Sequence, residues 1–206
     1  YEGDDYLVNL IDTPGHVDFG GDVTRAMRAV DGVVVLVDAV DGVMPQTETV
    51  MKQAMNEGVQ PVLFINKLDR LIEEMELTPE EMQERFTNII RKVNNILRKY
   101  ADEETAERWS MAVNDGTVAF GSALMNWAIS APYMQETGIT FSDIIERTNE
   151  GDHEGLSEDA PIEEVVLDMV VKHLNNPKES AQYRIPAIWP GDSESEVGQS
   201  MAEQDQ

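Results

Sequence analysis

Short, uninterrupted apolar runs alternate with longer amphipathic stretches along the first part of the chain. The runs cover residues 6–11, 33–37 and 61–65, and they are rich in β-branched side chains. Such continuous runs are typical of strands that are buried on both faces of a parallel sheet. Between them, apolar residues recur at helical spacing in two stripes, which contain Val23, Ala26, Met27 and Val30, and then Val50, Met51, Ala54 and Met55. This order of elements predicts an α/β fold with a doubly wound, mostly parallel sheet.

A longer helix is predicted to begin after Thr78, which has the side chain of an N-cap. Pro79 suits the first helical position, and Glu81 completes a capping box. Apolar residues then recur every three or four positions, at Met82, Phe86, Ile89, Val93, Ile96 and Tyr100. Since this run is too short for a sustained heptad seam, we expect the helix to pack with one face on the domain. Residues 162–174 form a second amphipathic pattern, closed by Asn175-Asn176-Pro177, and residues 191–206 form a polar tail.

A sharp loop, Asp12-Thr13-Pro14-Gly15-His16, follows the first predicted strand. Ligands of doubly wound sheets bind beyond the carboxyl ends of the strands, so Asp12, Asp38 and Asn66 are expected at one edge. There a carboxylate such as Asp12 can hold Mg²⁺ through water, and Gly15 can bring its N–H close to a terminal phosphate. His16 is the candidate for orienting an attacking water. The alternative is an ordinary strand-to-helix turn in which Asp12 caps the next helix.

A second polar loop, Asn66-Lys67-Leu68-Asp69, follows the third predicted strand. The carboxylate of Asp69 can accept hydrogen bonds from the N1–H and the exocyclic amino group of guanine, whereas N1 of adenine is itself an acceptor. The methylene stem of Lys67 can cover the purine face, and Asn66 can tie neighbouring loops together. The alternative is a plain polar turn, but the presence of the 12–16 loop two crossovers earlier favours a guanine site.

A weaker signal is Ser122-Ala123, after a short apolar run at residues 118–120. A backbone N–H here could reach the guanine carbonyl, and the alternative is a small-residue turn that opens a helix over residues 124–129. After Ser130 the chain is expected to be irregular, with order resuming at Pro161. His153 and His173 are interpreted as structural or solvated, because no second ligand is spaced to complete a metal site.

The charge balance changes the expected partners. The 206 residues include 40 Asp and Glu against 15 Lys and Arg, which gives a formal net charge of −25. Such a surface repels nucleic acid, so we expect no nucleic-acid contact from it; the spread of the charges along the chain is typical of halophilic proteins. No apolar run approaches the roughly 20 residues of a membrane-spanning helix. The absence of cysteine excludes disulfides and thiolate metal sites and fits a reducing cytoplasm.

Taken together, these loops resemble those of the translational GTPases. The match includes the 12–16 and 66–69 loops and the sequence DAVDGVMPQTET at residues 38–49. Within that family, residues 118–123 and Tyr183-Arg184-Ile185-Pro186 are similar to elongation factor 2, the translocase of archaea and eukaryotes, and the acidic charge points to a halophilic archaeon. The resemblance covers essentially the whole chain and implies a P-loop NTPase-type fold.

The resemblance implies a role for each loop. The GTP phosphates would be bound by Asp12, Thr13, Pro14, Gly15 and His16, with Mg²⁺ at Asp12 through water and His16 positioning the hydrolytic water. Guanine would be bound by Asn66, Lys67, Leu68, Asp69, Ser122, Ala123 and Leu124. The expected cofactors are GTP or GDP and Mg²⁺. The expected partner is the ribosome, with tRNA and mRNA engaged indirectly.

The same resemblance predicts that the chain is an N-terminally truncated fragment. It begins at Tyr1, and nothing in it matches Gly-x-x-x-x-Gly-Lys-Ser/Thr, the phosphate-cradling loop. Residues 1–180 would be the GTP-binding domain without its P-loop and switch I, with an irregular insert at about 132–160. Residues 181–206 would be a linker and the start of a β-barrel domain.

The parent protein would hydrolyse GTP to drive translocation, and the fragment alone would be inactive. The alternatives are a non-catalytic interaction module and another translational GTPase, such as an initiation or recycling factor.

Overall fold

A four-stranded sheet forms the centre of the computed structural model, which describes residues 5–13, 20–192 and 194–203. The strands are β1 (Gly32–Asp38), β2 (Gln60–Asn66), β3 (Val118–Ser122) and β4 (Trp127–Ser130), in the order β1-β2-β3-β4. β1, β2 and β3 are parallel, and β4 runs antiparallel to β3. The predicted α/β fold with a mostly parallel sheet is therefore confirmed.

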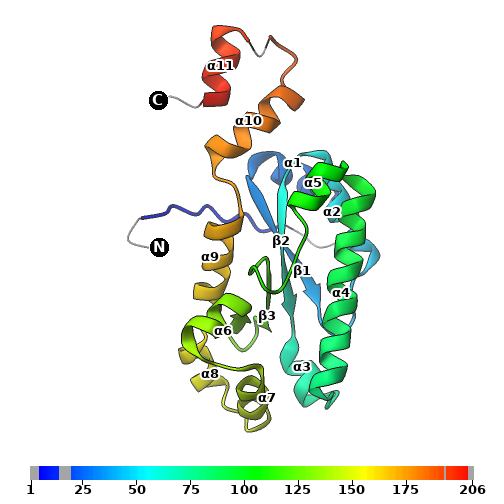
Figure 1. The fold of residues 1–206 in the computed structure, drawn as a ribbon, viewed down its shortest axis with the longest axis vertical. Coiled ribbons are helices and arrows are strands. Elements are labelled where there is room, and N and C mark those ends of the chain that lie inside the picture. The colour runs from blue at the N-terminus through cyan, green and yellow to red at the C-terminus, as the bar shows by residue number, and fades with distance from the viewer. Residues whose placement is uncertain (1–4, 14–19, 193, 204–206) are drawn as a thin grey trace.

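Helices cover both faces of this sheet (Figure 1). Along β2, Leu63 and Ile65 join a large core with helices α2 (Pro45–Asn56) and α4 (Pro79–Tyr100). The alternate residues Val62 and Phe64 face the opposite way and pack with α9 (Ile162–His173). Every residue of β2 from 61 to 65 is buried, which explains why its sequence is a continuous apolar run.

The predicted helices of the first hundred residues are present. The two stripes lie on α1 (Gly20–Ala29) and α2, and they meet in a small cluster that contains Val23, Met27 and Ala54. α4 begins as expected: Thr78 Oγ1 accepts from Glu81 N at 3.3 Å, and Thr78 N donates to Glu81 Oε2 at 2.9 Å. The short helices α3 (Leu68–Glu73) and α5 (Glu103–Arg108) flank α4 in the chain.

The strand predicted over residues 6–11 is wrong. Residues 5–13 carry no regular secondary structure, and Leu7 and Leu10 are exposed. A strand is held by hydrogen bonds to a neighbouring strand, and none of the described strands pairs with this segment. An apolar run alone is therefore not sufficient for a buried strand.

The segment after Ser130, predicted to be irregular over 132–160, consists of three short helices. They are α6 (Ala131–Thr137), α7 (Phe141–Asn149) and α8 (His153–Asp159), each opened by a capping side chain, from Ser130, Thr140 and Asp152. The alternative considered for Ser122-Ala123, a turn that opens a helix over residues 124–129, is wrong as well. β4 occupies that position instead, because residues 127–130 pair with β3 and are buried.

The C-terminal part is also helical where it is described. α9 confirms the helix predicted at 162–174. After the end of α9, Asn176 caps a further helix, α10 (Pro177–Ile188). Another helix, α11 (Glu196–Glu203), lies where a polar tail was predicted. Within the part assigned to a linker and a β-barrel start, 181–206, residues 181–188 and 196–203 are therefore helical, and the domain boundary itself stays a prediction.

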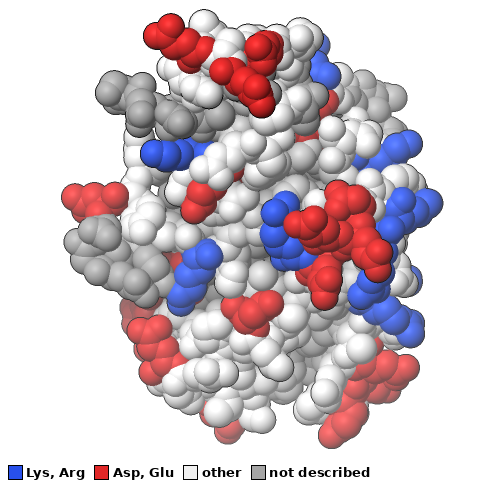
Figure 2. Space-filling view, turned by 45° about the horizontal axis from the view of Figure 1, so that its top comes forward, with Lys and Arg blue, Asp and Glu red and all other residues white. Residues whose placement is uncertain are grey.

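Charged side chains are distributed over the surface. Figure 2 shows acidic side chains in several groups on one face, with basic side chains between them. This arrangement agrees with the even spread of the net charge of −25 along the sequence. The described ranges contain no helix with the length and the apolar character of a membrane-spanning segment.

Candidate functional site

Two of the predicted loops meet at the carboxyl edge of the sheet. Asp38 and Asn66 are register partners at the ends of β1 and β2, so the expectation that they share an edge is confirmed. Asn66 Oδ1 accepts from the backbone N–H of Lys67 at 2.8 Å and from that of Ala123 at 2.9 Å. One side-chain oxygen therefore joins the loop after β2 to the loop after β3, as predicted for Asn66.

Asp69 is the buried carboxylate of the site. It lies in the first turn of α3, and only 5% of its surface is exposed. Its Oδ1 has no hydrogen-bond partner among the residues that the structure describes. A buried acceptor without a donor is costly, so this atom fits a ligand that brings N–H groups. The N1–H and amino group of guanine are such donors, and the residues present thus fit a guanine base.

Lys67 adopts an uncommon backbone conformation directly before α3. Its φ and ψ are 67° and 39°, in the left-handed region, which non-glycine residues rarely occupy. Its Nζ lies 2.7 Å from Asp38 Oδ2. Asp38 Oδ1 in turn accepts from the N–H groups of Val40 at 2.7 Å and Asp41 at 3.2 Å. The carboxylate at the end of β1 therefore fixes the lysine at the end of β2.

The surroundings of Asp38 also favour its ionised form. Burial raises the pKa of this carboxyl, but the hydrogen bond from Lys67 and those from the Val40 and Asp41 amides lower it, and the net pKa lies below the ordinary value. Asp38 is thus a fixed negative charge beside the Lys67 ammonium. From the sequence, Asp38 was expected at this edge without a role of its own; its position at a strand end was the available signal.

The loop after β3 completes the edge. Ser122 is buried, and its Oγ accepts from the backbone N–H of Met125 at 3.2 Å, which closes the turn between β3 and β4. Leu124 is 81% exposed at the tip of this turn. The Ala123 N–H, considered above for the guanine carbonyl, donates to Asn66 in this structure.

The phosphate end of the predicted site is described only in part. Asp12 is exposed and Thr13 is half-buried, whereas Pro14, Gly15 and His16 lie outside the described residues. No cluster of three or more His, Cys, Asp or Glu side chains suited to a metal occurs in the described ranges. The roles of the 12–16 loop and the Mg²⁺ contact of Asp12 therefore remain predictions.

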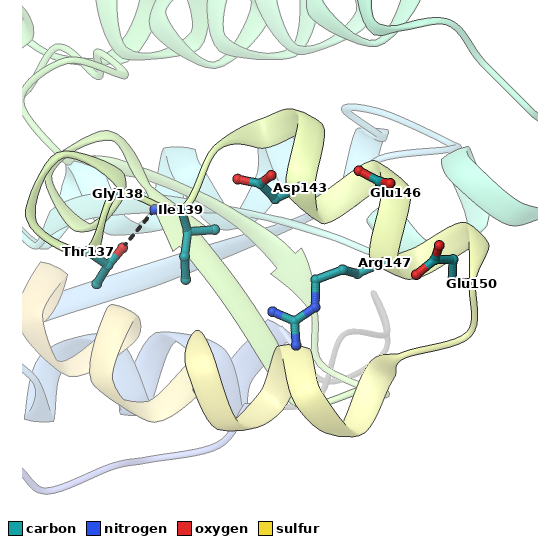
Figure 3. A pocket seen from close by; sticks show the side chains of 7 residues that line it. All are labelled: Thr137, Gly138, Ile139, Asp143, Glu146, Arg147 and Glu150. Atoms are coloured by element: carbon teal, nitrogen blue, oxygen red, sulfur yellow. Dashed lines mark hydrogen bonds between the residues drawn. The ribbon is translucent and has the colours of Figure 1, made fainter.

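A surface hollow of about 470 Å³ lies elsewhere, over the turn between α6 and α7 (Figure 3). Its lining residues are Thr137, Gly138, Ile139, Asp143, Glu146, Arg147 and Glu150. The one basic side chain, Arg147, is engaged by Asp152 and Asp159. Three carboxylates around one neutralised guanidinium repel a phosphate, so this hollow does not suit a nucleotide.

Comparisons with known proteins agree with the geometry of this edge. The chain is 64% identical over 201 residues to Elongation factor 2 of Thermococcus kodakarensis, a match that covers 98% of this chain and 28% of that protein. It is 63% identical to Elongation factor 2 of Pyrococcus abyssi and of Methanocaldococcus jannaschii, with the same coverage. The chain therefore spans 28% of the length of these relatives. The family described as Elongation factor Tu GTP binding domain matches residues 1–176, and the chain belongs to that family.

Proposed function

We propose that the whole protein is a translation elongation factor that hydrolyses GTP and promotes the ribosomal translocation of tRNA and mRNA. The observation that carries this proposal is the buried Asp69 Oδ1, which has no hydrogen-bond partner in the described part of the chain, three residues after Asn66, in a chain of the GTP-binding family. The names of the relatives, Elongation factor 2, support the choice of translocation over initiation or recycling. The ribosome is then the partner, and the cytoplasm is the compartment in which the protein works.

In this proposal the chain provides the base-reading half of the GTP site. Asp69 accepts from guanine N1–H and from the amino group, and hypoxanthine, which lacks that group, binds less tightly. Asn66 holds the loops after β2 and β3 at a fixed separation, so that the turn at Ser122 closes the other side of the base. Lys67, held by Asp38, lays its methylene stem over the purine.

The 12–16 loop provides contacts to the phosphate end. We assign Asp12 to a water-mediated contact with Mg²⁺, which when bound would neutralise charge on the phosphate oxygens. Gly15 offers its N–H to the terminal phosphate, and His16 orients the attacking water. The oxygen of that water bonds to the γ-phosphorus while the bond to the β–γ bridging oxygen breaks, which yields GDP and inorganic phosphate without a covalent enzyme intermediate.

The sequence Gly-x-x-x-x-Gly-Lys-Ser/Thr does not occur in these 206 residues. That loop supplies most of the phosphate contacts in GTPases, so we expect the 206-residue chain by itself to be inactive in hydrolysis. Activity is expected from the full-length protein on the ribosome.

The test is ribosome-stimulated GTP hydrolysis by the full-length protein. We expect stimulated turnover in the parent, and loss of most of that stimulation in His16→Ala with GDP affinity unchanged, because His16 is assigned to the water and not to the base. Asp168→Asn, on α9, is a matched control that should leave both measurements unchanged. GDP binding without ribosome-stimulated hydrolysis in the parent would instead support a non-catalytic interaction module.

A further inference from the structure

The three helices α6–α8, residues 131–159, contact helix α3, which begins in the first loop that the proposed function assigns to guanine, and strand β4, which follows the second. We propose that this segment is a positioning element for the base site, and that the contact of His153 with Glu73 holds α3 in the orientation that presents Asp69 to guanine. This inference rests on the proposed guanine binding and adds residues to it that the loops themselves do not include.

Helix α3 needs support from outside. It has only six residues, and its N-cap, Lys67, makes no side-chain capping hydrogen bond. A helix of that length is not stable by itself, so its orientation is set by its packing. Asp69 and Glu73 are four residues apart and therefore lie on the same face of α3. A contact that fixes Glu73 thus also limits the rotation of the helix that carries Asp69.

His153 provides that contact from the first turn of α8. Its Nε2 lies 3.0 Å from Glu73 Oε1; the side chain of His153 is 21% exposed and that of Glu73 is 37% exposed, so the histidine is partly buried and the carboxylate lies at the surface. The other ring nitrogen, Nδ1, is buried without a partner among the described residues. Two residues 80 positions apart in sequence are thereby joined, although neither helix is a neighbour of the other in the chain.

Helices α7 and α8 form one unit that can hold His153 in place. Arg147 of α7 donates from Nε to Asp152 Oδ2 and from Nη1 to Asp159 Oδ2, each at 2.8 Å. These two carboxylates flank α8 at its beginning and its end, and Figure 3 shows Arg147 extending from its helix toward the neighbouring one. Asp152 also caps α8, because its Oδ1 accepts from Gly155 N at 3.1 Å.

Apolar packing adds to the ion pair. Ile144 of α7 and Leu156 of α8 are fully buried in the same core cluster as Leu71 and Ile72 of α3. α3 packs directly on α7. The polar contact at Glu73 and the apolar contact at Leu71 and Ile72 therefore both connect α3 to the unit formed by α7 and α8.

The far end of the segment is attached to the other guanine loop. Ala160 O, directly after α8, accepts from Ala128 N in β4 at 2.9 Å, and Tyr133 OH of α6 donates to Asp159 O at 3.0 Å. β4 pairs with β3 up to the partners Trp127 and Ser122. The segment thus spans from the Asp69 helix to the strand pair that carries the Ser122 turn.

The test measures GDP and IDP affinity in the full-length protein. IDP lacks the amino group that Asp69 accepts from, so the ratio of the two affinities reports the placement of Asp69. Both Glu73→Ala and His153→Ala are expected to weaken GDP binding about three- to tenfold and to reduce the preference for GDP over IDP, and His153→Gln, whose amide can still donate to Glu73, is expected to restore much of both. The control is Glu48→Ala, which removes the exposed pair with Lys99 between α2 and α4 and should leave the ratio unchanged.

Distinct outcomes separate the inference from the proposed function. A folded Glu73→Ala protein with the parental preference for GDP over IDP would overturn the positioning role, and so would an equal loss of GDP and IDP affinity that accompanies a lowered Tm. If His153→Ala does not fold, the nucleotide affinities of Glu73→Ala and His153→Gln still test the positioning role. A parent protein that binds neither nucleotide would instead refute the proposed guanine site.

Discussion

Lys67 Nζ lies 2.7 Å from Asp38 Oδ2 and joins the carboxyl ends of two neighbouring parallel strands. Asp38 is held in turn by two backbone amides of its own loop. Lys67 is 47% exposed at its side chain, so the pair adds modestly to stability; its main effect is on where the lysine stem lies. Two experiments follow from this relationship, one on binding and one on pH.

Replacement of Asp38 by Asn removes the charge that orients Lys67. We expect the full-length protein to lose about 0.5 to 1 kcal/mol of GDP binding, or about two- to fivefold in Kd, because the pair is partly solvated. Titration with a fluorescent GDP analogue measures this change. Asp115→Asn, in a turn outside the site, serves as the control. An unchanged Kd in Asp38→Asn would show that Lys67 needs no such partner.

The same pair gives a pH dependence of stability. The pKa of Asp38 is raised by burial and lowered more strongly by Lys67 and the two amides, so it lies below its ordinary value of 3.8. The unfolded chain therefore binds more protons than the folded one in that range, and stability rises with pH. We expect the difference in unfolding free energy between the parent and Asp38→Asn to be largest above about pH 5 and to shrink as pH falls below about 3.8. Urea unfolding of both proteins at several pH values measures this difference in free energy. A difference that does not change with pH would contradict the lowered pKa of Asp38.

Asp69→Asn changes which base the site accepts. An amide side chain presents one acceptor and one donor, so it cannot receive both guanine donors as a carboxylate does. We expect GDP affinity to fall by about 1.5 to 3 kcal/mol, while the xanthine nucleotide, with a carbonyl in place of the amino group, gains affinity. Competition between GDP and XDP is the measurement. Equal losses for both nucleotides would indicate that the variant damages the fold and not the recognition.

Gly121→Ala should disturb the pairing of β3 with β4. A Cβ on Gly121 would lie 2.8 Å from the Ala128 Cα and against the Trp127 carbonyl oxygen, both of them backbone atoms that cannot turn aside. We expect a loss of about 1 to 3 kcal/mol in unfolding free energy. Gly21→Ala is the control: among the described residues its Cβ would meet the end of Arg25 alone, at 3.9 Å, so the change should be neutral or stabilising. Thermal unfolding of the two variants measures the difference, and an equal stability of Gly121→Ala and Gly21→Ala would contradict the expected clash.

Arg184→Ala removes the contacts of α10 with the end of α1. The guanidinium donates to the carbonyl oxygens of Val30 at 2.6 Å and of Met27 and Arg28 at 3.2 Å each. These are carbonyl groups of the last helical turn and its exit, which lack partners within the helix. We expect the free energy of unfolding to fall by about 1 to 3 kcal/mol, and amide hydrogen exchange in the last turn of α1 to become faster. Arg25→Ala, which loses only an exposed pair with Asp22, should change neither quantity.

The sequence allowed prediction of elements whose signals are local. The cap of α4 at Thr78 and Glu81 is one example, and the buried run of β2 is another. Asn66 was expected to tie loops together because polar residues at parallel strand ends converge on one edge, and its bond to Ala123 confirms this. These conclusions needed only short-range pattern and one rule of topology.

Features that depend on distant partners were not predictable. Residues 6–11 have the composition of a strand, but a strand also needs a neighbour, which composition does not reveal. Glu73 and His153 lie 80 positions apart, so no spacing rule links them. The helices α6–α8 are short and lie in polar, acidic sequence, so they lack a strong apolar periodicity; the capping residues Thr140 and Asp152 are the local signal that marks where two of them begin.

The position of β1 at the border of the sheet has a consequence for handling the chain. In the described part of the chain, β1 pairs with β2 only, and Leu36 on it is exposed. Unpaired strand edges act as templates for a second copy, so a purified sample is expected to self-associate as its concentration rises. Mutual repulsion from the net charge of −25 opposes this, and dissolved salt screens the repulsion. Ionic strength should therefore set whether the chain stays dispersed, with dilute buffer keeping it monomeric and concentrated salt promoting aggregates.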